Sequence, residues 1–208
     1  MLRFACTGSR PEPYAAGPSL QLDLRVTEIS GRRVHTASLR VQIRIDPRRR
    51  RYTRTETDKL ADLFGATHRW GDTLNPLQLA TVGVMLPSFT GSTTVPLNVP
   101  LTYDLDVAAG TYFHALEEGE VPLLLLFSGT LFYAGDTGVQ VGLVPWHEEA
   151  EHRLPVTVWR AAMDEHFPGC GWVRLRRETI DALLAYRSAQ AVPTWDETIE
   201  RLLKVAHR

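Results

Sequence analysis

Apolar and polar side chains alternate strictly along much of the first half of the chain, and this period of two restricts the fold more than any other feature. Residues 20–26 and residues 39–45 each place an apolar side chain at every second position. A strand with this pattern has one face against a core and the other in water. We expect the two stretches to form an antiparallel pair that turns near Ser30 and Gly31.

A third alternating stretch, residues 93–105, contains Pro96 and Pro100. Proline has no backbone N–H, so we expect an edge strand or a bend that splits the run in two. Residues 121–133 (VPLLLLFSGTLFY) are apolar on both phases, which favours a strand covered on both faces. With residues 139–144 (VQVGLV) they form an expected hairpin.

Helical patterns dominate the last third of the chain. Thr53 with Glu56, and Thr194 with Glu197, fit capping boxes, and Asp106 is a further candidate cap. The expected helices cover residues 56–65, 107–119, 154–167, 177–191 and 193–206. Strands before helices indicate an α+β fold, an antiparallel β-sheet or sandwich in the N-terminal two-thirds covered by C-terminal helices. We expect a single domain, 1–208, with 1–145 mainly β and a helical part, 146–208, packed on it.

Composition excludes several classes of protein. The 208 residues carry a net charge of −1, so no overall field attracts a polyanion or an anionic membrane. The two cysteines, Cys6 and Cys170, are too few for a disulfide framework. The N-terminus lacks the apolar segment of a signal peptide, and the longest apolar run is far shorter than the roughly 20 residues that span a bilayer. We therefore expect a reduced, cytoplasmic protein with no membrane association.

Four consecutive arginines, Arg48 to Arg51, follow the second alternating stretch and precede a helix. In an extended segment Arg48 and Arg50 point one way and Arg49 and Arg51 the other. The candidate binding residues are Arg48, Arg49, Arg50, Arg51, Trp70 and Trp172, the two indoles offering stacking surface. No DNA- or RNA-binding signature accompanies them, so we expect a phosphate-bearing ligand or an acidic protein surface before nucleic acid. The alternative is a solvated strand end whose charge prevents edge-to-edge pairing.

Motifs for metal binding and catalysis are weak. His147 and His152 are five residues apart, which separates them by about 140° on a helix, so HEEAEH is interpreted as a polar loop rather than a zinc site. His114 and Glu118 have the spacing of a helical acid–base pair, and a carboxylate there would favour the protonated imidazole. Cys170 and His166 form a thiol site only if folding brings them together. No nucleotide-binding motif is present, and we assign no catalytic residue, metal or cofactor.

Several segments resemble one family of about this length: RPEPYAA, RRRRY, RWGDTLNPL, PSFTGST, LLLLFSGT, VPW, GWVRLRRETIDALL and PTWDETIE. The family is uncharacterised, occurs mainly in actinobacteria, and is catalogued as a domain of unknown function. Its members are associated with gene neighbourhoods of nickel–iron hydrogenases, which implies an accessory role in hydrogenase assembly or function. The resemblance implies no catalytic residues, and the chain lacks the C-x-x-C pairs of a nickel or iron–sulfur carrier.

Three functional hypotheses follow. The first is a non-enzymatic accessory or protein-binding scaffold that presents exposed Trp and Arg residues to a protein partner, a hydrogenase component being one candidate. The second is an enzyme whose site is assembled from distant residues around His114, His166 or Cys170. The third is a phosphate or nucleic-acid binder that uses Arg48 to Arg51.

Overall fold

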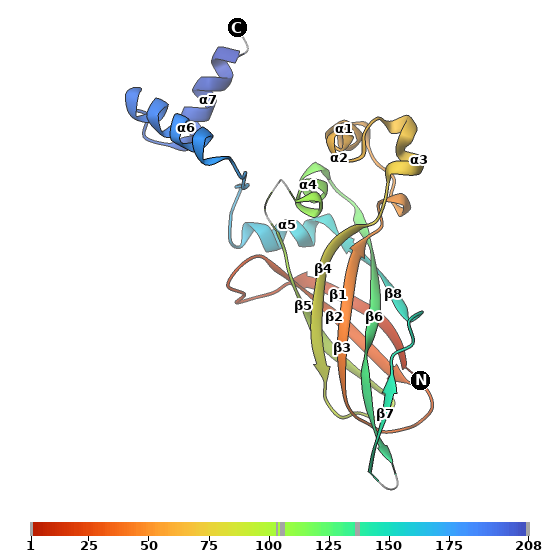
Figure 1. The fold of residues 1–208 in the computed structure, drawn as a ribbon. Coiled ribbons are helices and arrows are strands. Elements are labelled where there is room, and N and C mark those ends of the chain that lie inside the picture. The colour runs from red at the N-terminus through yellow and green to blue at the C-terminus, as the bar shows by residue number, and fades with distance from the viewer. Residues whose placement is uncertain (1, 103, 105–106, 136–137, 207–208) are drawn as a thin grey trace. The chain divides into compact units, whose positions relative to one another are not determined.

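The computed structural model describes residues 2–102, 104, 107–135 and 138–206 (Figure 1). The chain divides into two compact units, Met1–Trp172 and Val173–Arg208. The first unit contains the two β-sheets and the second contains a pair of helices. The expectation of one domain over 1–208 stays a prediction.

Two antiparallel sheets make up most of the first unit. The smaller sheet has the order β1–β2–β5 and consists of Leu2–Pro11, Ser19–Glu28 and Ser92–Pro100. The larger sheet has the order β4–β3–β6–β7, and β8 also pairs with β6. Its strands are Leu77–Leu86 (β4), Val34–Ile45 (β3), Glu120–Gly135 (β6), Gly138–Leu143 (β7) and Glu149–Pro155 (β8).

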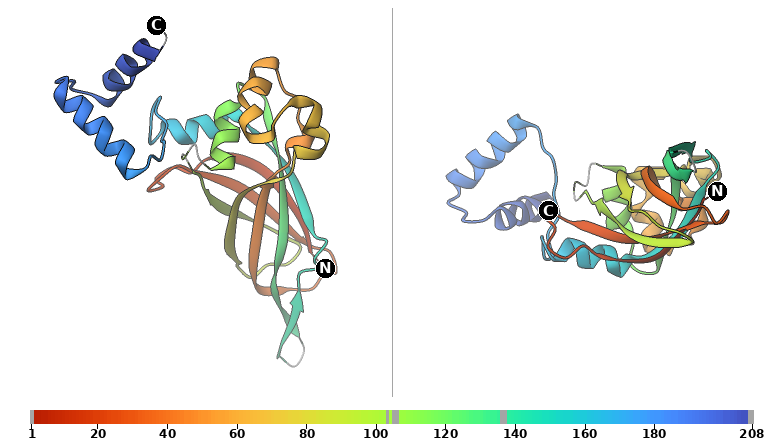
Figure 2. Two further views of the ribbon diagram at one scale, coloured as in Figure 1. Left: turned by 45° about the horizontal axis from the view of Figure 1, so that its top comes forward. Right: turned by 90° about the horizontal axis from the view of Figure 1, so that it is seen from below.

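The core lies between the two sheets, which face each other as layers (Figure 2). The apolar side chains of residues 20–26 on β2 and of residues 39–45 on β3 are buried. Phe4 of β1 stacks on Phe127 of β6 with ring centroids 4.0 Å apart, which joins the sheets through the core. The predicted α+β fold, with antiparallel sheets in the N-terminal two-thirds and helices at the C-terminus, is confirmed.

The predicted pairing of the first two alternating stretches is wrong. β2 pairs with β1 and β5, whereas β3 pairs with β4 and β6, so the stretches belong to different sheets. Both patterns are correct in phase, because each strand buries its apolar face. Alternation determines which face of a strand meets the core, but it does not determine the hydrogen-bonded neighbour.

Other predicted strands agree with the structure. β5 lies at the edge of the smaller sheet, where its prolines need no donor. The hairpin of β6 and β7 pairs from Thr130 with Leu143 to Gly135 with Gly138. The side chains on the core face of β6 are buried, but Leu124 and Leu126 on its other face are half-buried, so the coverage is less than predicted.

Short helices cover one end of the sheets, opposite the β6–β7 hairpin (Figure 1). They are α1 (Arg54–Lys59), α2 (Ala61–Phe64), α3 (Trp70–Thr73) and α4 (Ala108–Ala115), with 3₁₀ turns η1 (Pro47–Arg49) and η2 (Thr67–Arg69). The predicted capping box at Thr53 and Glu56 is present. Gly110 lies inside α4 because a Cβ atom there would come 2.4 Å from the backbone oxygen of Asp104. The candidate cap Asp106 lies outside the described residues.

Helix α5 (Val156–Asp164) follows β8 directly and packs on β1 and β2. It lies within the predicted range and begins after Pro155. Beyond α5, Trp172 makes a parallel bridge with Asp104, and residues 173–176 belong to no strand.

The second unit consists of α6 (Arg177–Ala189) and α7 (Trp195–Ala206), which contact each other. Both were predicted from helical spacing. The Thr194 hydroxyl accepts a hydrogen bond from the Glu197 N–H at 3.2 Å, as expected at a helix start. Among the described residues, neither these helices nor those of the first unit are long and apolar enough to cross a bilayer.

Candidate functional site

An open hollow of about 530 Å³ lies where β3 passes into α1. Its lining comes from η1, α1, the start of β6 and β8, and therefore joins four parts of the chain. The lining residues are Arg49, Arg50, Arg51, Thr53, Glu56, Glu118, Gly119, Glu120 and Arg153. Three of the four consecutive arginines thus belong to one hollow.

Arg50 and Glu56 form a buried ion pair at this hollow. The Arg50 Nη2 atom lies 2.6 Å from Glu56 Oε1, and the two side chains are 7% and 1% exposed. Arg50 also donates to the backbone oxygens of Glu118 and Glu120, at 2.6 and 2.7 Å. The ion pair therefore ties the start of α1 to the segment that enters β6.

The Glu56 carboxylate is held in its ionised form. Burial alone would raise its pKa, but hydrogen bonds from the backbone N–H groups of Glu117 and Thr53 and from Arg50 outweigh burial and lower the pKa. The Glu56 side chain completes the capping box with Thr53 at the same time. Glu56 is thus a structural carboxylate with each oxygen already occupied.

The remaining arginines of the run differ in whether their side chains bind other groups of the chain. Arg48 donates to the backbone oxygen of Leu74 at 2.8 Å. Arg49 forms a two-point ion pair with Glu151 of β8, at 2.5 and 2.9 Å. Arg51 is exposed and lines the hollow together with Arg153. Arg48, Arg49 and Arg50 therefore bind carboxylates or backbone carbonyl oxygens of the chain itself.

Aromatic side chains pack beneath the arginines. Tyr52 donates to the Pro47 oxygen at 2.8 Å, and its hydroxyl lies 2.9 Å from that of Tyr112. Burial raises the pKa of Tyr52 to about 12 and also raises the pKa of Tyr112. Trp70 packs edge-on against Tyr52 and donates to the Gly65 oxygen, so it supports this cluster rather than an open stacking surface.

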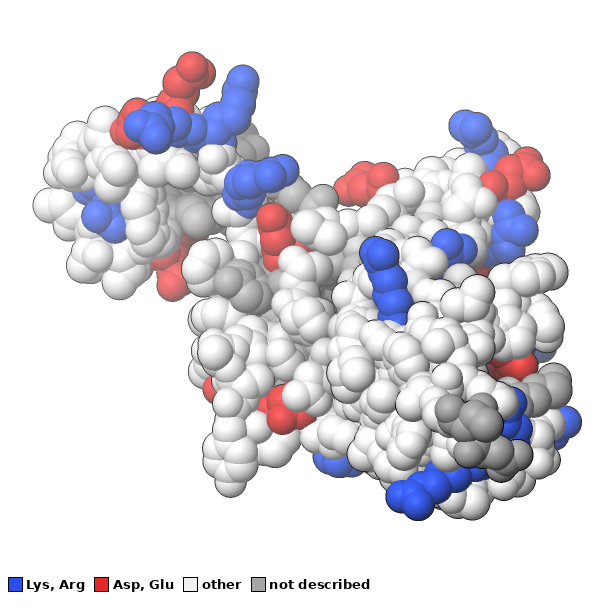
Figure 3. Space-filling view, turned by 60° about the horizontal axis from the view of Figure 1, so that its bottom comes forward, with Lys and Arg blue, Asp and Glu red and all other residues white. Residues whose placement is uncertain are grey.

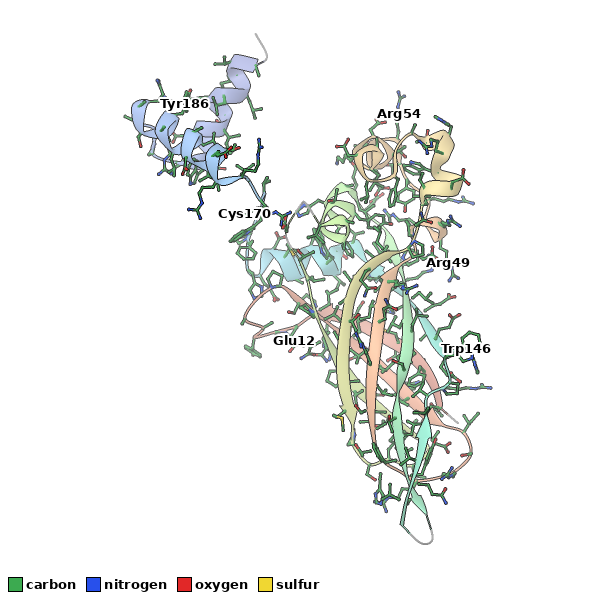
Figure 4. The ribbon with its side chains drawn as sticks, in the orientation of Figure 1. Glu12, Arg49, Arg54, Trp146, Cys170 and Tyr186 are labelled. Carbon is green, nitrogen blue, oxygen red and sulfur yellow. The ribbon has the colours of Figure 1, made fainter. Side chains whose placement is uncertain are left out.

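Trp172 lies in another part of the first unit. Its ring packs edge-on against Phe167, and it follows Cys170, which Figure 4 shows well away from Arg49. The candidate residues Arg48 to Arg51, Trp70 and Trp172 therefore do not converge on one surface. The hollow brings together three of the arginines only.

Charges of both signs surround the hollow. Arg51 and Arg153 face a lining that also contains Glu118 and Glu120. Across the face shown in Figure 3, basic and acidic side chains are likewise interspersed among uncharged residues. A phosphate at the hollow would meet carboxylates as well as guanidinium groups, so the lining is better suited to a surface of mixed charge.

His114 and Glu118 do not have the predicted helical relation. Helix α4 ends at Ala115 and Leu116 is extended, so Glu118 lies beyond the helix. The His114 ring instead packs edge-on against Trp159, with centroids 5.1 Å apart. Burial lowers the pKa of His114, which is opposite to the effect expected from a paired carboxylate.

His166 and Cys170 contact backbone groups near the C-terminal end of α5. The His166 Nε2 atom lies 2.9 Å from the Ala15 oxygen, and Nδ1 lies 3.4 Å from the Ala162 oxygen. The Cys170 thiol is exposed and donates to the Pro168 oxygen. These contacts place the imidazole beside two carbonyl oxygens and provide no argument for a thiol–imidazole site.

The predicted polar loop at 147–152 is wrong for most of its length: His147 and Glu148 lie in the turn, but Glu149–Pro155 forms β8. Ala150 and Leu154 of β8 are buried and His152 between them is half-buried, next to β1. Its Nε2 atom is buried and has no hydrogen-bond partner, and burial lowers its pKa. Within the described part of the chain no three His, Cys, Asp or Glu side chains gather as metal ligands would.

Sequence reasoning missed Arg153, Glu118 and Glu120 as lining residues of the hollow. Their positions depend on β8 pairing with the first half of β6, from Glu120 with Pro155 to Leu126 with Glu149. The sequence signal for β8 is the pair of apolar residues Ala150 and Leu154, which lie on the same face of the strand and are both buried. The polar residue between them, His152, interrupted that pattern.

Comparison with known proteins establishes a family but no activity. The model of the family of unknown function DUF6084 matches residues 1–208, and the chain belongs to that family. No curated protein matches the sequence. A structure of β-glucosidase 3B from Thermotoga neapolitana in complex with α-D-glucose is 13% identical, with a TM-score of 0.27. The match covers 74% of this chain and 17% of that chain, and a likeness this weak supports no argument.

Proposed function

We propose that this member of the DUF6084 family is a non-enzymatic accessory protein that binds a protein partner at the hollow beside β8. The observation that carries the proposal is the mixed charge of the hollow. Arg51, Arg153, Glu118 and Glu120 line it, and among the described residues their charged groups have no hydrogen bond or ion pair. Interspersed charges of both signs give specificity for a complementary protein surface.

An exposed indole in the turn before β8 supports the proposal. Trp146 precedes β8 and is 91% exposed, and Figure 4 shows it on the same side of the first unit as Arg49. Trp and Arg are the residues that contribute most to binding energy in protein interfaces. We therefore assign Trp146 to the surface, in place of the sequence candidates Trp70 and Trp172.

The partner we propose is a component of a nickel–iron hydrogenase. This identification rests on the resemblance described for the sequence, and the hollow supplies only the requirement for a protein with exposed charges of both signs. An actinobacterial, cytoplasmic setting belongs to the same proposal.

The alternative of a phosphate or nucleic-acid site has weaker support. Arg48, Arg49 and Arg50 already bind groups of this chain, so a phosphate would have to displace them or rely on Arg51. A polyanion ligand predicts binding that falls steeply with salt, by a log–log slope of roughly 0.7–0.9 for each phosphate neutralised. A protein surface of mixed charge predicts a much shallower dependence.

The test is direct binding of the purified chain to purified hydrogenase subunits, measured by calorimetry. A variant with Arg51→Glu, Arg153→Glu and Trp146→Ala should lose most of the affinity. Its matched control carries Arg25→Glu and Tyr14→Ala, which change an exposed arginine of β2 and an exposed aromatic ring elsewhere. Equal binding by both variants would refute the surface, and no binding by the unaltered chain would refute the hydrogenase partner.

A further inference from the structure

The composition of strand β7 suits pairing with a strand of a second chain along its outer edge. It lies at the end of the larger sheet, and its sequence GVQVGL contains no charged residue and no proline. Val139, Val141 and Leu143 are 58%, 66% and 75% exposed. An edge strand with these properties is open to pairing with a second chain, because nothing in it opposes pairing.

A hydrogen bond just beyond the end of β7 shows which residues of β7 direct their backbone groups toward β6. The Val144 N–H donates to the Gly129 oxygen at 3.0 Å, which makes this a hydrogen-bonded pair in register with β7 and β6. Hydrogen-bonded and non-hydrogen-bonded pairs alternate along an antiparallel ladder. Val139, Val141 and Leu143 therefore direct their N–H and C=O groups away from β6, toward the free edge.

The other sheet edges in the described part of the chain are protected. β1 carries Arg3 and Arg10, has a bulge between Cys6 and Gly8, and lies against β8. β5 contains two prolines, and β4 lies against β5 where the two sheets approach each other. β8 carries two glutamates and an arginine. β4 also lacks charge and proline, but it lies against β5, whereas the main neighbour of β7 is β6, on the side away from its outer edge.

We propose that β7 pairs antiparallel with β7 of a second copy of this chain, about a two-fold axis through Val141. In this register Val141 faces Val141 of the second copy, and Val139 faces Leu143. Each of these is a hydrogen-bonded pair, because all three residues direct their backbone groups outward. The larger sheet then continues across the axis, which removes its free edge.

The side chains support a second copy as the occupant. On one face, every cross-strand pair at the axis is apolar, and Phe132 of β6 lies beside Val141 in register. On the other face, Gln140, whose side-chain oxygen accepts a hydrogen bond from Arg32, meets Gly142 of the second copy, where the absence of a side chain leaves room for the amide. The strand brings no like charges together at the axis. The match of β7 to itself in this register therefore makes a second copy the occupant we propose, and this dimer does not depend on the proposed partner at the hollow.

The first test is the mass of the full chain in solution over a concentration series, by sedimentation equilibrium. The unaltered chain should dimerise. Val141→Lys should weaken the dimer by at least about 100-fold, because two ammonium groups would meet at the axis and the apolar contact would be lost. The control is Met85→Lys, which changes an exposed apolar residue of β4 to the same side chain. A monomer at every concentration, or a dimer unaffected by Val141→Lys, would overturn the proposal.

A second test fixes the register. In a chain with Cys6→Ser and Cys170→Ser, Val141→Cys should cross-link to itself with a short bismaleimide, because the axis places the two residues opposite each other. Val139→Cys should cross-link efficiently to Leu143→Cys on a second copy and poorly to itself. Efficient self-linking at 139 with none at 141 would mean another register and would reject the two-fold axis at Val141.

Discussion

β7 and β8 pair with the same strand, one after the other along one edge of β6, yet they differ in almost every other respect. β8 pairs with residues 120–126 of β6 and β7 with residues 130–135. β8 carries Glu149, Glu151 and Arg153 and lies against β1. β7 is uncharged and exposes three apolar side chains.

The difference shows that two segments of one sheet edge suit different kinds of partner. Charge on β8 is partly used within the chain, since Glu151 binds Arg49, and partly left at the hollow, where Arg153 remains available. The β7 edge carries backbone groups, three exposed apolar side chains and one uncharged polar side chain, Gln140. A mixed-charge surface suits a specific, exchangeable partner, whereas an apolar strand edge suits a sheet-forming one.

The largest effect is expected where the edge changes from β7 to β8, at Gly129. Its φ is 152°, and a Cβ atom there would come 2.1 Å from the backbone oxygen of Ser38. Gly129→Ala should therefore lower the free energy of unfolding by about 3 kcal/mol or more, because backbone must move in two strands. Urea unfolding followed by circular dichroism measures this loss.

The control for this prediction is Gly83→Ala on the opposite side of β3. A Cβ atom at Gly83 would lie 3.9 Å from the Leu39 oxygen, an ordinary contact. It should leave stability nearly unchanged. Equal losses for the two variants would show that the junction of β7 and β8 places no special demand on Gly129.

A loss of comparable size is expected when the buried arginine pair is broken, and a small one when the exposed pair is broken. Arg50→Ala leaves Glu56 buried without its cation and should cost about 3–5 kcal/mol of unfolding free energy. Arg49→Ala removes an exposed pair with Glu151 and should change stability little. Chemical unfolding of both variants decides the matter, and a comparable loss for Arg49→Ala would mean that β8 depends on that pair.

The sequence predicted the features that depend on neighbouring residues. The phases of β2 and β3, the cap at Thr53 and the β6–β7 hairpin each follow from patterns within a few residues. Strand β4 escaped prediction because of a bulge. Ile43 pairs with Ala80 and Arg44 with Gln78, so Leu79 is an extra residue that reverses the apolar phase within the strand.

The candidate site was less predictable because its contacts are distant in sequence. Nothing near Arg49 indicates that Glu151 will neutralise it, and Arg50 is fixed by backbone oxygens of Glu118 and Glu120. The run of arginines suggested a ligand because its internal partners could not be seen. The exposure of Trp146 likewise depends on how β8 pairs with β6, which alternation alone does not determine.

The smallest effect concerns pH and separates β8 from β7, which has no titratable side chain. Burial lowers the pKa of His152 below its ordinary 6.5, despite opposing effects from the Cys6 backbone and Glu120. The unfolded chain therefore binds a proton first, so stability is complete above about pH 6.5 and falls as the pH drops through and below that value. The pKa of Glu56 is lowered from its ordinary 4.5, so protonation of Glu56 reduces the stability of the fold only below about pH 4.5.

His152→Leu should flatten the stability profile between pH 6.5 and 4.5, while the slope that His114 contributes through its own lowered pKa remains. The exposed residue His35 provides the control variant His35→Leu, which should retain the full slope. Alkylation of Cys6, whose thiol has a pKa raised to about 11 by burial, reports opening of β1 from β8 at each pH after correction for thiolate content. An unchanged profile in His152→Leu would mean that the contact between β8 and β1 tolerates a charged imidazole, and the contrast with β7 would then rest on the carboxylates and Arg153 alone.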